Sequence, residues 1–334
     1  MYELLGASLA LAGLLTVNAI ASLIASGVWR TMSRRARLWS AVTRSRLLFA
    51  LRVFPTVGAL FLVFGIIAPS YLIYEPAHSG EEIGPGLAVM AALAVLGVVL
   101  AVWRGVAAWL ATRKLIREWT RAGQPLSLGS TPLPSYILRH PFPVIAIVGV
   151  IRPRIFVAEQ VLSALTPDEL TASVAHELGH LSSHDNLKRA ILRACRDVLT
   201  IVPCGRFLDR SWTDASEEAA DERATDGDPI AALNLASALI KIARLVPHGT
   251  RPTMPSAAYL IGDNESGAIN ERVRKLLQRR AGAIVSNRLQ ERVVGVALWS
   301  IAVAFLSATF CLAVTPGALA YTHSGLEWVV AALK

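Results

Sequence analysis

The stretch "AHELGHLSSHDN" (residues 175–186) carries a short metal-binding signature. It contains three histidines at even spacing, His176, His180 and His184, and Glu177 directly follows the first of them. An HExxH sequence on a helix places two imidazoles one turn apart on the same face, where both can bind one metal ion, and it places the glutamate beside the open coordination position. We therefore predict that His176 and His180 are metal ligands and that Glu177 is the general base of a hydrolase.

The residues ahead of the motif favour the helix that this interpretation needs. In "TPDEL", Thr166 can act as the N-cap, Pro167 occupies the first helical position, and Glu169 stands three residues after the cap, which makes a capping box. This helix is expected to run through the motif. The alternative interpretation is an ordinary helix whose histidines are surface or core residues.

A catalytic zinc site with two histidines needs a third protein ligand, and two residues compete for this role. On a continuous helix His184 would lie about 12 Å along the axis from His176, rotated by about 80°, too far to share the ion. Glu217, in "SEEAADERA", is the other candidate. Asp221 lies four residues later on the same helix face, where it could accept a hydrogen bond from a ligating histidine and fix its tautomer. Judged alone, these acids could equally solvate a helix start.

The composition indicates a membrane protein. Hydrophobic residues make up 54% of the 334 residues, and the mean hydropathy is +0.48, which is too apolar for a soluble chain. A helix needs about 20 apolar residues to cross a bilayer. Four runs meet this requirement, at about 4–29, 53–74, 87–112 and 293–314.

The charges in the loops predict the orientation, because Lys and Arg near span ends stay cytoplasmic. The connection 30–52 carries seven arginines and no acid, whereas "EPAHSGEEIGPG" (75–86) carries three glutamates and no base. We therefore expect both chain termini outside and the segment 113–292 in the cytoplasm, in a bacterial cytoplasmic membrane. The basic loop accounts for much of the net charge of +9, so direct nucleic-acid binding is not expected. The three cysteines form no CxxC, which suggests neither a disulfide framework nor a cysteine zinc site.

The segment between the third and fourth spans is long enough for a domain with its own core. Its sequence "FPVIAIVGVIRPRIFVAEQVL" (142–162) breaks at Gly149–Pro153 and predicts a hairpin or two short strands. Further helices are predicted at about 186–202, 215–226, 229–246 and 268–280. The expected fold class is α+β, mainly α, with four transmembrane helices and a cytoplasmic zincin-like domain inserted between the third and fourth. The expected divisions are 1–112 (three spans and a basic cytoplasmic loop), 113–292 (metallopeptidase), 293–314 (fourth span) and 315–334 (short outside tail).

The sequence "PRIFVAEQVLSALTPDELTASVAHELGHLSSHDNLKR", followed by "EEAADERA", resembles the integral-membrane gluzincin metallopeptidases. In those proteins a strand precedes the HExxH helix, and an ExxxD helix supplies the third zinc ligand. The chain is most similar to the BlaR/MecR receptor metallopeptidase family. The similarity lies in the order of spans and in the segments "VGVIRPRIFV", "HELGHLSSHDNL" and "INERVRKLL". The HtpX and CAAX-protease branch is the second choice. The resemblance implies one Zn²⁺ per chain, bound by His176, His180 and Glu217, and it implies supporting roles for Asp185 and Asp221.

Three departures qualify the resemblance. The BlaR/MecR branch often has Cys before the Asp of its ExxxD motif, whereas Ala220 stands here. The known receptors carry a penicillin-binding sensor domain after the last span, whereas only "TPGALAYTHSGLEWVVAALK" follows here. HtpX members insert transmembrane helices between the two motifs, whereas this chain has the charged stretch 186–214. A role in β-lactam sensing is therefore not supported.

The expected activity is zinc-dependent hydrolysis of peptide bonds. Glu177 would take a proton from the attacking water and deliver it to the leaving amine. Candidate donors to the transition state are His248, Tyr259 and Arg272. By resemblance, a protein substrate would bind as an extended strand along an edge near 144–157.

The partners and the biological role follow from the resemblance only in outline. The expected partners are a protein or peptide substrate and the lipid bilayer, and a BlaI-like winged-helix repressor is implied by the resemblance alone. One alternative is an HtpX-like protease for quality control of membrane proteins. The other is a non-catalytic receptor or scaffold with a structural zinc, against which Glu177 argues because a structural site does not need a general base.

Overall fold

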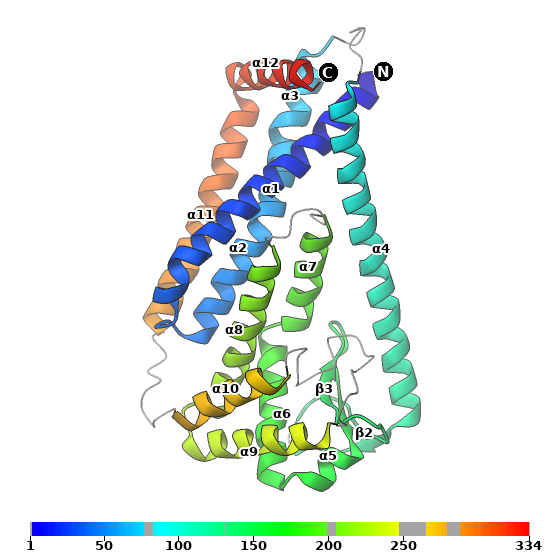
Figure 1. Ribbon diagram of the computed structural model, residues 1–334, viewed down its shortest axis with the longest axis vertical. Coiled ribbons are helices and arrows are strands. Elements are labelled where there is room, and N and C mark those ends of the chain that lie inside the picture. Colours follow the sequence, from blue (N-terminus) through cyan, green and yellow to red (C-terminus); the bar gives the residue numbers. More distant parts are fainter. Residues whose placement is uncertain are drawn as a thin grey trace.

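A computed structural model of the chain describes residues 2–76, 83–129, 131–198, 205–246, 265–278 and 288–333. Within this part of the chain, four helical runs are long and apolar enough to cross a membrane: Tyr2–Ala36, Ala41–Tyr74, Pro85–Ala122 and Glu291–Val314. Figure 1 shows these runs extending along the long axis, with the N- and C-terminal ends of the chain at the same end of the molecule. The structure thus confirms the four candidate spans.

The helices of the spans extend beyond the apolar runs that predicted them. α1 (Tyr2–Ala36), α2 (Ala41–Leu62), α4 (Pro85–Ala122) and α11 (Arg288–Val314) form the four runs, and the second continues from α2 through a π-helical turn, η1 (Val63–Ile67), into α3 (Ala68–Tyr74). The second run starts at Ala41, before the predicted residue 53, and the third ends at Ala122, after the predicted residue 112. Hydropathy detects contact with lipid, whereas a helix can continue into water through its basic residues.

The predicted outside tail contains a further helix, α12 (Pro316–Ala332). It lies across the end of the bundle beside α3 (Figure 1). The Ser70 hydroxyl donates to the Leu319 carbonyl over 2.7 Å, and the Tyr74 hydroxyl donates to the Pro316 carbonyl over 2.9 Å. These bonds fix α12 against the C-terminal end of the second run.

A small mixed sheet follows α4 in the sequence. It contains β1 (Gln124–Leu126), β2 (Ser135–Leu138), β3 (Ile145–Val148) and β4 (Arg154–Ala158) in the spatial order β1-β2-β4-β3. β3 and β4 pair antiparallel, which confirms the predicted hairpin, and Gly149 at its turn has φ +110, a conformation that favours glycine. β2 and β4 pair parallel, and β1 pairs antiparallel with β2. The strand β3 therefore forms one edge of the sheet.

Between the sheet and α11, the described residues form six helices: α5 (Glu159–Ala164), α6 (Pro167–Ser182), α7 (Asp185–Val198), α8 (Gly205–Thr225), α9 (Pro229–Leu245) and α10 (Glu265–Gln278). Apolar residues of the sheet pack with α6 and α9 into one core. The predicted capping box is present at the start of α6. The expectation that this helix runs through the motif is confirmed, because α6 contains both His176 and His180; it ends at Ser182, and α7 begins at Asp185.

The helix α8 lies along the N-terminal part of α2. Arg52 of α2, 2% exposed, pairs with Asp209 of α8 through Nε and Oδ1 at 3.0 Å. The backbone N–H of Ala41, at the start of α2, donates to the Glu222 carboxylate at 3.1 Å. Burial makes an unpaired charge costly, so the pair at Arg52 ties the two helices together.

Candidate metal centre

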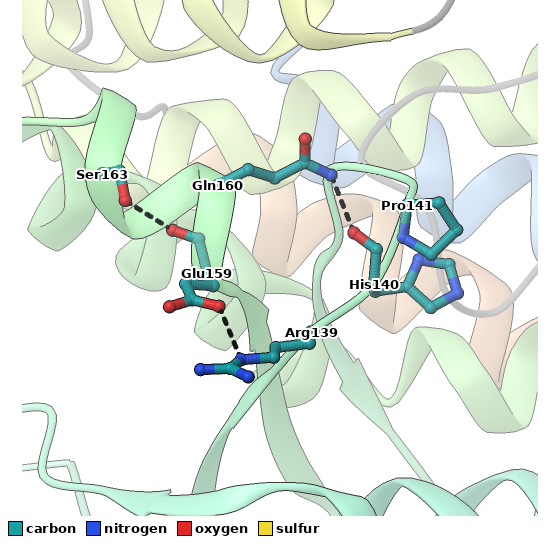
Figure 2. A pocket seen from close by; sticks show the side chains of 6 residues that line it. All are labelled: Arg139, His140, Pro141, Glu159, Gln160 and Ser163. Atoms are coloured by element: carbon teal, nitrogen blue, oxygen red, sulfur yellow. Dashed lines mark hydrogen bonds and ion pairs between the residues drawn. The ribbon is translucent and has the colours of Figure 1, made fainter.

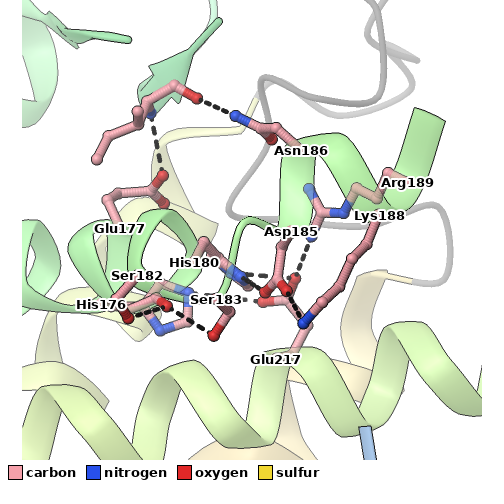
Figure 3. Close-up of polar contacts among 12 residues, drawn as sticks. His176, Glu177, His180, Ser182, Ser183, Asp185, Asn186, Lys188, Arg189 and Glu217 are labelled. Carbon is pink, nitrogen blue, oxygen red and sulfur yellow. Dashed lines mark hydrogen bonds and ion pairs between the residues drawn. The ribbon is translucent and has the colours of Figure 1, made fainter. Parts of the chain in front are cut away.

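The ligand atoms of His176, His180 and Glu217 gather at one point between α6 and α8. One nitrogen of each histidine and one carboxylate oxygen of the glutamate lie within 4.8 Å of one another, a spacing that could hold a metal ion. His176 is fully buried, and Glu217 is partly buried. Figure 3 shows these side chains converging from the two helices. The structure therefore brings together the three residues that were predicted as ligands.

Two aspartates orient the histidine rings. Nδ1 of His176 lies 2.9 Å from Oδ1 of Asp221, and Nδ1 of His180 lies 2.8 Å from Oδ2 of Asp185. A proton on Nδ1, shared with the aspartate, leaves the Nε2 atom of each ring to bind a metal ion. Nε2 of His176 lies 3.6 Å from the Glu217 carboxylate, and Nε2 of His180 lies 3.5 Å from it. A carboxylate that accepts from the outer ring nitrogen fixes the tautomer of a metal-binding histidine. The geometry is the one that the supporting roles of Asp185 and Asp221 require.

A tight turn between α6 and α7 brings Asp185 back to the site. His184 has φ 56, a left-handed backbone conformation that is uncommon for residues other than glycine. The turn reverses the chain so that Asp185 reaches His180. His184 itself is not among the grouped ligand atoms. The sequence argument excluded His184 as a ligand by assuming a continuous helix through it. The helix is broken at this residue, so that geometric argument does not apply.

The close packing of α6 against α8 depends on Gly179. A Cβ at this position would lie 3.2 Å from both Cα and the carbonyl oxygen of Ala220. Ala220 is fully buried. Because His180 follows Gly179 directly and Glu217 precedes Ala220 by one turn, this contact sets the distance between the ligands of the two helices.

The charges around the site keep its acids ionised. Burial raises the pKa of Glu217, but His180, His176 and Arg272 outweigh it and hold that pKa well below its ordinary value. Burial likewise opposes ionisation of Asp221, yet Arg272 and His176 bring its pKa to about 2. Burial lowers the pKa of His180, whereas Glu217 and Asp185 raise it, with a net result of about 9. Glu217 and Asp221 are therefore ionised and paired with these cations, and a metal ion that binds here would release the proton of the His180 ring.

One oxygen of Glu217 is placed to act as a metal ligand. Among the described residues, Oε2 of Glu217 is buried without a hydrogen bond. Nη1 of Arg272 lies 3.2 Å away at ion-pair distance but does not form a hydrogen bond with it. A buried carboxylate oxygen without a hydrogen bond, beside two imidazole nitrogens, is the donor set that Zn²⁺ prefers. The residues therefore fit the ion.

Arg272, a predicted transition-state donor, is the only one of the three candidates that lies in the described part of the chain. Its Nη2 and Nε donate to the two oxygens of Asp221 at 2.7 Å and 3.0 Å. The side chain is 9% exposed and its Nη2 also lies 3.5 Å from the His176 ring. This fork fixes the aspartate that orients His176. His248 and Tyr259 lie outside the described residues.

The predicted base Glu177 is directed toward the edge strand β3. Its Oε2 accepts a hydrogen bond from the backbone N–H of Ile147 at 3.1 Å, and the side chain is 6% exposed. Nδ2 of Asn186 donates to the carbonyl oxygens of Ile147 and Gly149 at 3.1 Å and 3.3 Å. Figure 3 shows Glu177 and Asn186 reaching this strand from separate helices. Sequence reasoning did not identify Asn186, although it directly follows Asp185.

A surface pocket lies apart from this centre. It is lined by Arg139, His140, Pro141, Glu159, Gln160 and Ser163. In Figure 2, the amide of Gln160 donates to the carbonyl oxygen of His140, and Arg139 pairs with Glu159. The last two side chains are mostly exposed, and none of the six belongs to the metal cluster. The pocket therefore adds nothing to the chemistry of the metal centre.

Residues 133–248 match the model of Peptidase family M48. The matched segment runs from just before β2 to just past α9 and contains His176, His180 and Glu217. Peptidases of this family are zinc-dependent. No curated protein and no solved structure matched the chain. Together with the four candidate spans, the match supports a membrane-associated metallopeptidase.

Proposed function

We propose that the chain is a membrane-anchored zinc-dependent endopeptidase. The observation that carries the proposal is the arrangement of His176 and His180, whose Nε2 atoms face Glu217 while Asp221 and Asp185 hold their Nδ1 atoms. The three ligands would leave a coordination position open, as catalytic zinc sites do. The match to Peptidase family M48 supports this assignment independently.

The roles of the residues follow from their places. When bound, Zn²⁺ supplies a Lewis acid that polarises the scissile carbonyl and lowers the pKa of water. Glu177 takes the proton of the attacking water and delivers it to the leaving amine, because it follows the ligand His176 directly on α6 and its carboxylate faces the edge strand. Arg272 fixes Asp221, and through it His176, so it acts as a positioning residue.

The substrate is an extended segment of a protein. The strand β3 is an edge strand, and an edge offers unpaired backbone groups to a further strand. Because β3 lies beside the ligand helix at Glu177, a strand paired there would pass the metal centre. Selectivity would then favour unfolded or extended segments over folded ones.

The proposed topology places this centre in the cytoplasm of a bacterial cell. The seven arginines of 30–52 and the three glutamates of 75–86 support an orientation with both termini outside. The peptidase domain, residues 113–292, would then be inserted between the third and fourth spans. A reporter fused after Lys334 is expected to report a periplasmic location, and a cytoplasmic signal would reverse the orientation.

The biological role is regulatory in this proposal, as the resemblance to the BlaR/MecR family implies, with a winged-helix repressor as the candidate substrate. Protein N-termini would be compared between cells with the wild-type chain and cells with Glu177→Gln, a change that leaves the proposed ligands intact. New termini in one repressor, present only with the wild type, would establish a regulatory protease. Termini scattered over many membrane proteins would establish quality control instead. If the two sets were identical under envelope stress, a scaffold with structural zinc would replace both.

A further inference from the structure

At Ile147, two side chains form hydrogen bonds with the backbone groups on the unpaired edge of β3. The N–H of Ala158 in β4 donates to the carbonyl of Val144, the residue just before β3, over 2.7 Å. Backbone groups alternate in direction along an antiparallel strand, so those of Ile147, three residues later, point away from β4. Both are already bonded, the N–H to Glu177 and the carbonyl to Asn186. The peptide groups that a further strand would use are therefore closed at this position.

The two side chains that bond to Ile147 come from different helices beside the metal centre. Glu177 lies on α6 between the two histidines, and Asn186 is the second residue of α7, directly after the aspartate that holds His180. Asn186 spans two outward carbonyls, those of Ile147 and Gly149. Hence the closed part of the edge lies directly beside the metal centre.

Competition for these groups has a physical consequence. One N–H cannot serve a carboxylate and a substrate carbonyl equally, and the charged acceptor forms the stronger bond. A strand that extends its pairing past Ile147 must therefore displace Glu177 and Asn186. The displaced carboxylate of Glu177 becomes free to bind water at the metal centre.

We propose that Glu177 and Asn186 form an edge latch on Ile147, which an extended substrate displaces, so that pairing of the substrate releases the general base. This inference rests on the proposed peptidase function and adds regulation to it. It assigns Asn186 as a positioning residue that controls access to the edge. The free protein then holds its base on β3, and a peptide unable to form a strand leaves it there.

The test measures peptide binding instead of hydrolysis. The full-length chain in detergent is stripped of metal with a chelator, so that no variant cleaves the probe. The probe is a fluorescein-labelled ten-residue peptide of alternating Val and Thr, and its affinity is measured by fluorescence anisotropy. The same peptide N-methylated at every residue cannot donate to a strand and serves as the control ligand. Asn186→Ala and Asn186→Asp remove the donor to the strand, and Thr171→Ala on the exposed side of α6 is the control variant.

The latch predicts tighter binding when Asn186 can no longer close the edge. Each Asn186 variant is expected to bind the probe about three- to tenfold more tightly than the wild type, because a net hydrogen bond to the strand no longer has to be displaced. The N-methylated peptide and Thr171→Ala should show no gain. Unchanged or weaker binding by both Asn186 variants overturns the latch, as does an equal gain with the N-methylated peptide. A negative result here leaves the cleavage comparison with Glu177→Gln unaffected, so the two proposals fail separately.

Discussion

Replacing Gly179 by alanine tests whether the spacing of α6 and α8 controls the metal centre. The new Cβ would lie 3.2 Å from Cα and from the carbonyl oxygen of Ala220, and 3.5 Å from its Cβ. Carbon atoms pack best at about 3.5–4.0 Å, so the two helices must separate by a few tenths of an ångström. Alanine gains about 1 kcal/mol over glycine as a helix former, whereas overpacking costs about 1–3 kcal/mol. The free energy of unfolding should therefore fall by only about 0–2 kcal/mol.

Metal binding is expected to respond more strongly than stability. The shift moves His180 away from Glu217, and ligand distances to zinc are tolerated only within about 0.2 Å. We expect Gly179→Ala to weaken zinc affinity at least about tenfold, equivalent to about 1.4 kcal/mol. Competition with a chromophoric chelator measures this affinity in the purified chain, and thermal unfolding measures stability. Gly105→Ala is the control, because nothing lies within 4 Å of a Cβ in that helical position. Wild-type zinc affinity in Gly179→Ala would show that this contact does not set the ligand distances.

Three further tests, with four substitutions, separate the metal site from the rest of the fold. Glu217→Ala should lose zinc while His184→Ala retains most of it, and metal analysis of the purified variants showing the reverse order would refute the ligand assignment. Glu169→Gln removes a carboxylate whose pKa lies at about 2, because hydrogen bonds and a lysine on α9 outweigh its burial. The ionised carboxylate therefore stabilises the fold above pH 4.5, and this stabilisation is lost as the pH falls toward 2. The variant should be about 2 kcal/mol less stable at pH 6 by thermal unfolding, with less than half that difference at pH 3. Arg52→Ala removes the buried cation that pairs with Asp209 and should destabilise the chain by about 3 kcal/mol, whereas unchanged stability would show that this pair contributes nothing.

Local patterns in the sequence were sufficient to predict the ligand helix. The capping box at Thr166 and Glu169 is present, and the spacing within "HELGH" places its histidines together on α6. A helical face also relates Glu217 to Asp221 four residues later. These relations depend on one helical turn, which sequence spacing describes directly.

Relations between distant segments could not be predicted in the same way. Asn186 and Ile147 are separated by 39 residues, and their contact depends on which strand forms the edge of the sheet. The short strands β1 and β2 contain too few residues for a recognisable alternation. The break at His184 was missed because its left-handed conformation is stabilised without glycine, the usual sequence signal for such a turn.

The metal centre and the membrane spans are joined more closely than the sequence divisions suggest. Glu218, the residue after Glu217, pairs with Arg44 at the start of α2 and with Lys275 of α10. Burial opposes ionisation of Glu218, but these two cations lower its pKa. Glu217 is the preceding residue of the same helix, about 100° around its axis. The membrane helix α2 and the helix α10, which carries Arg272, therefore both fix the position of α8. A displacement of α2 would therefore act on α8, and so on Glu217, through the ion pair between Arg44 and Glu218.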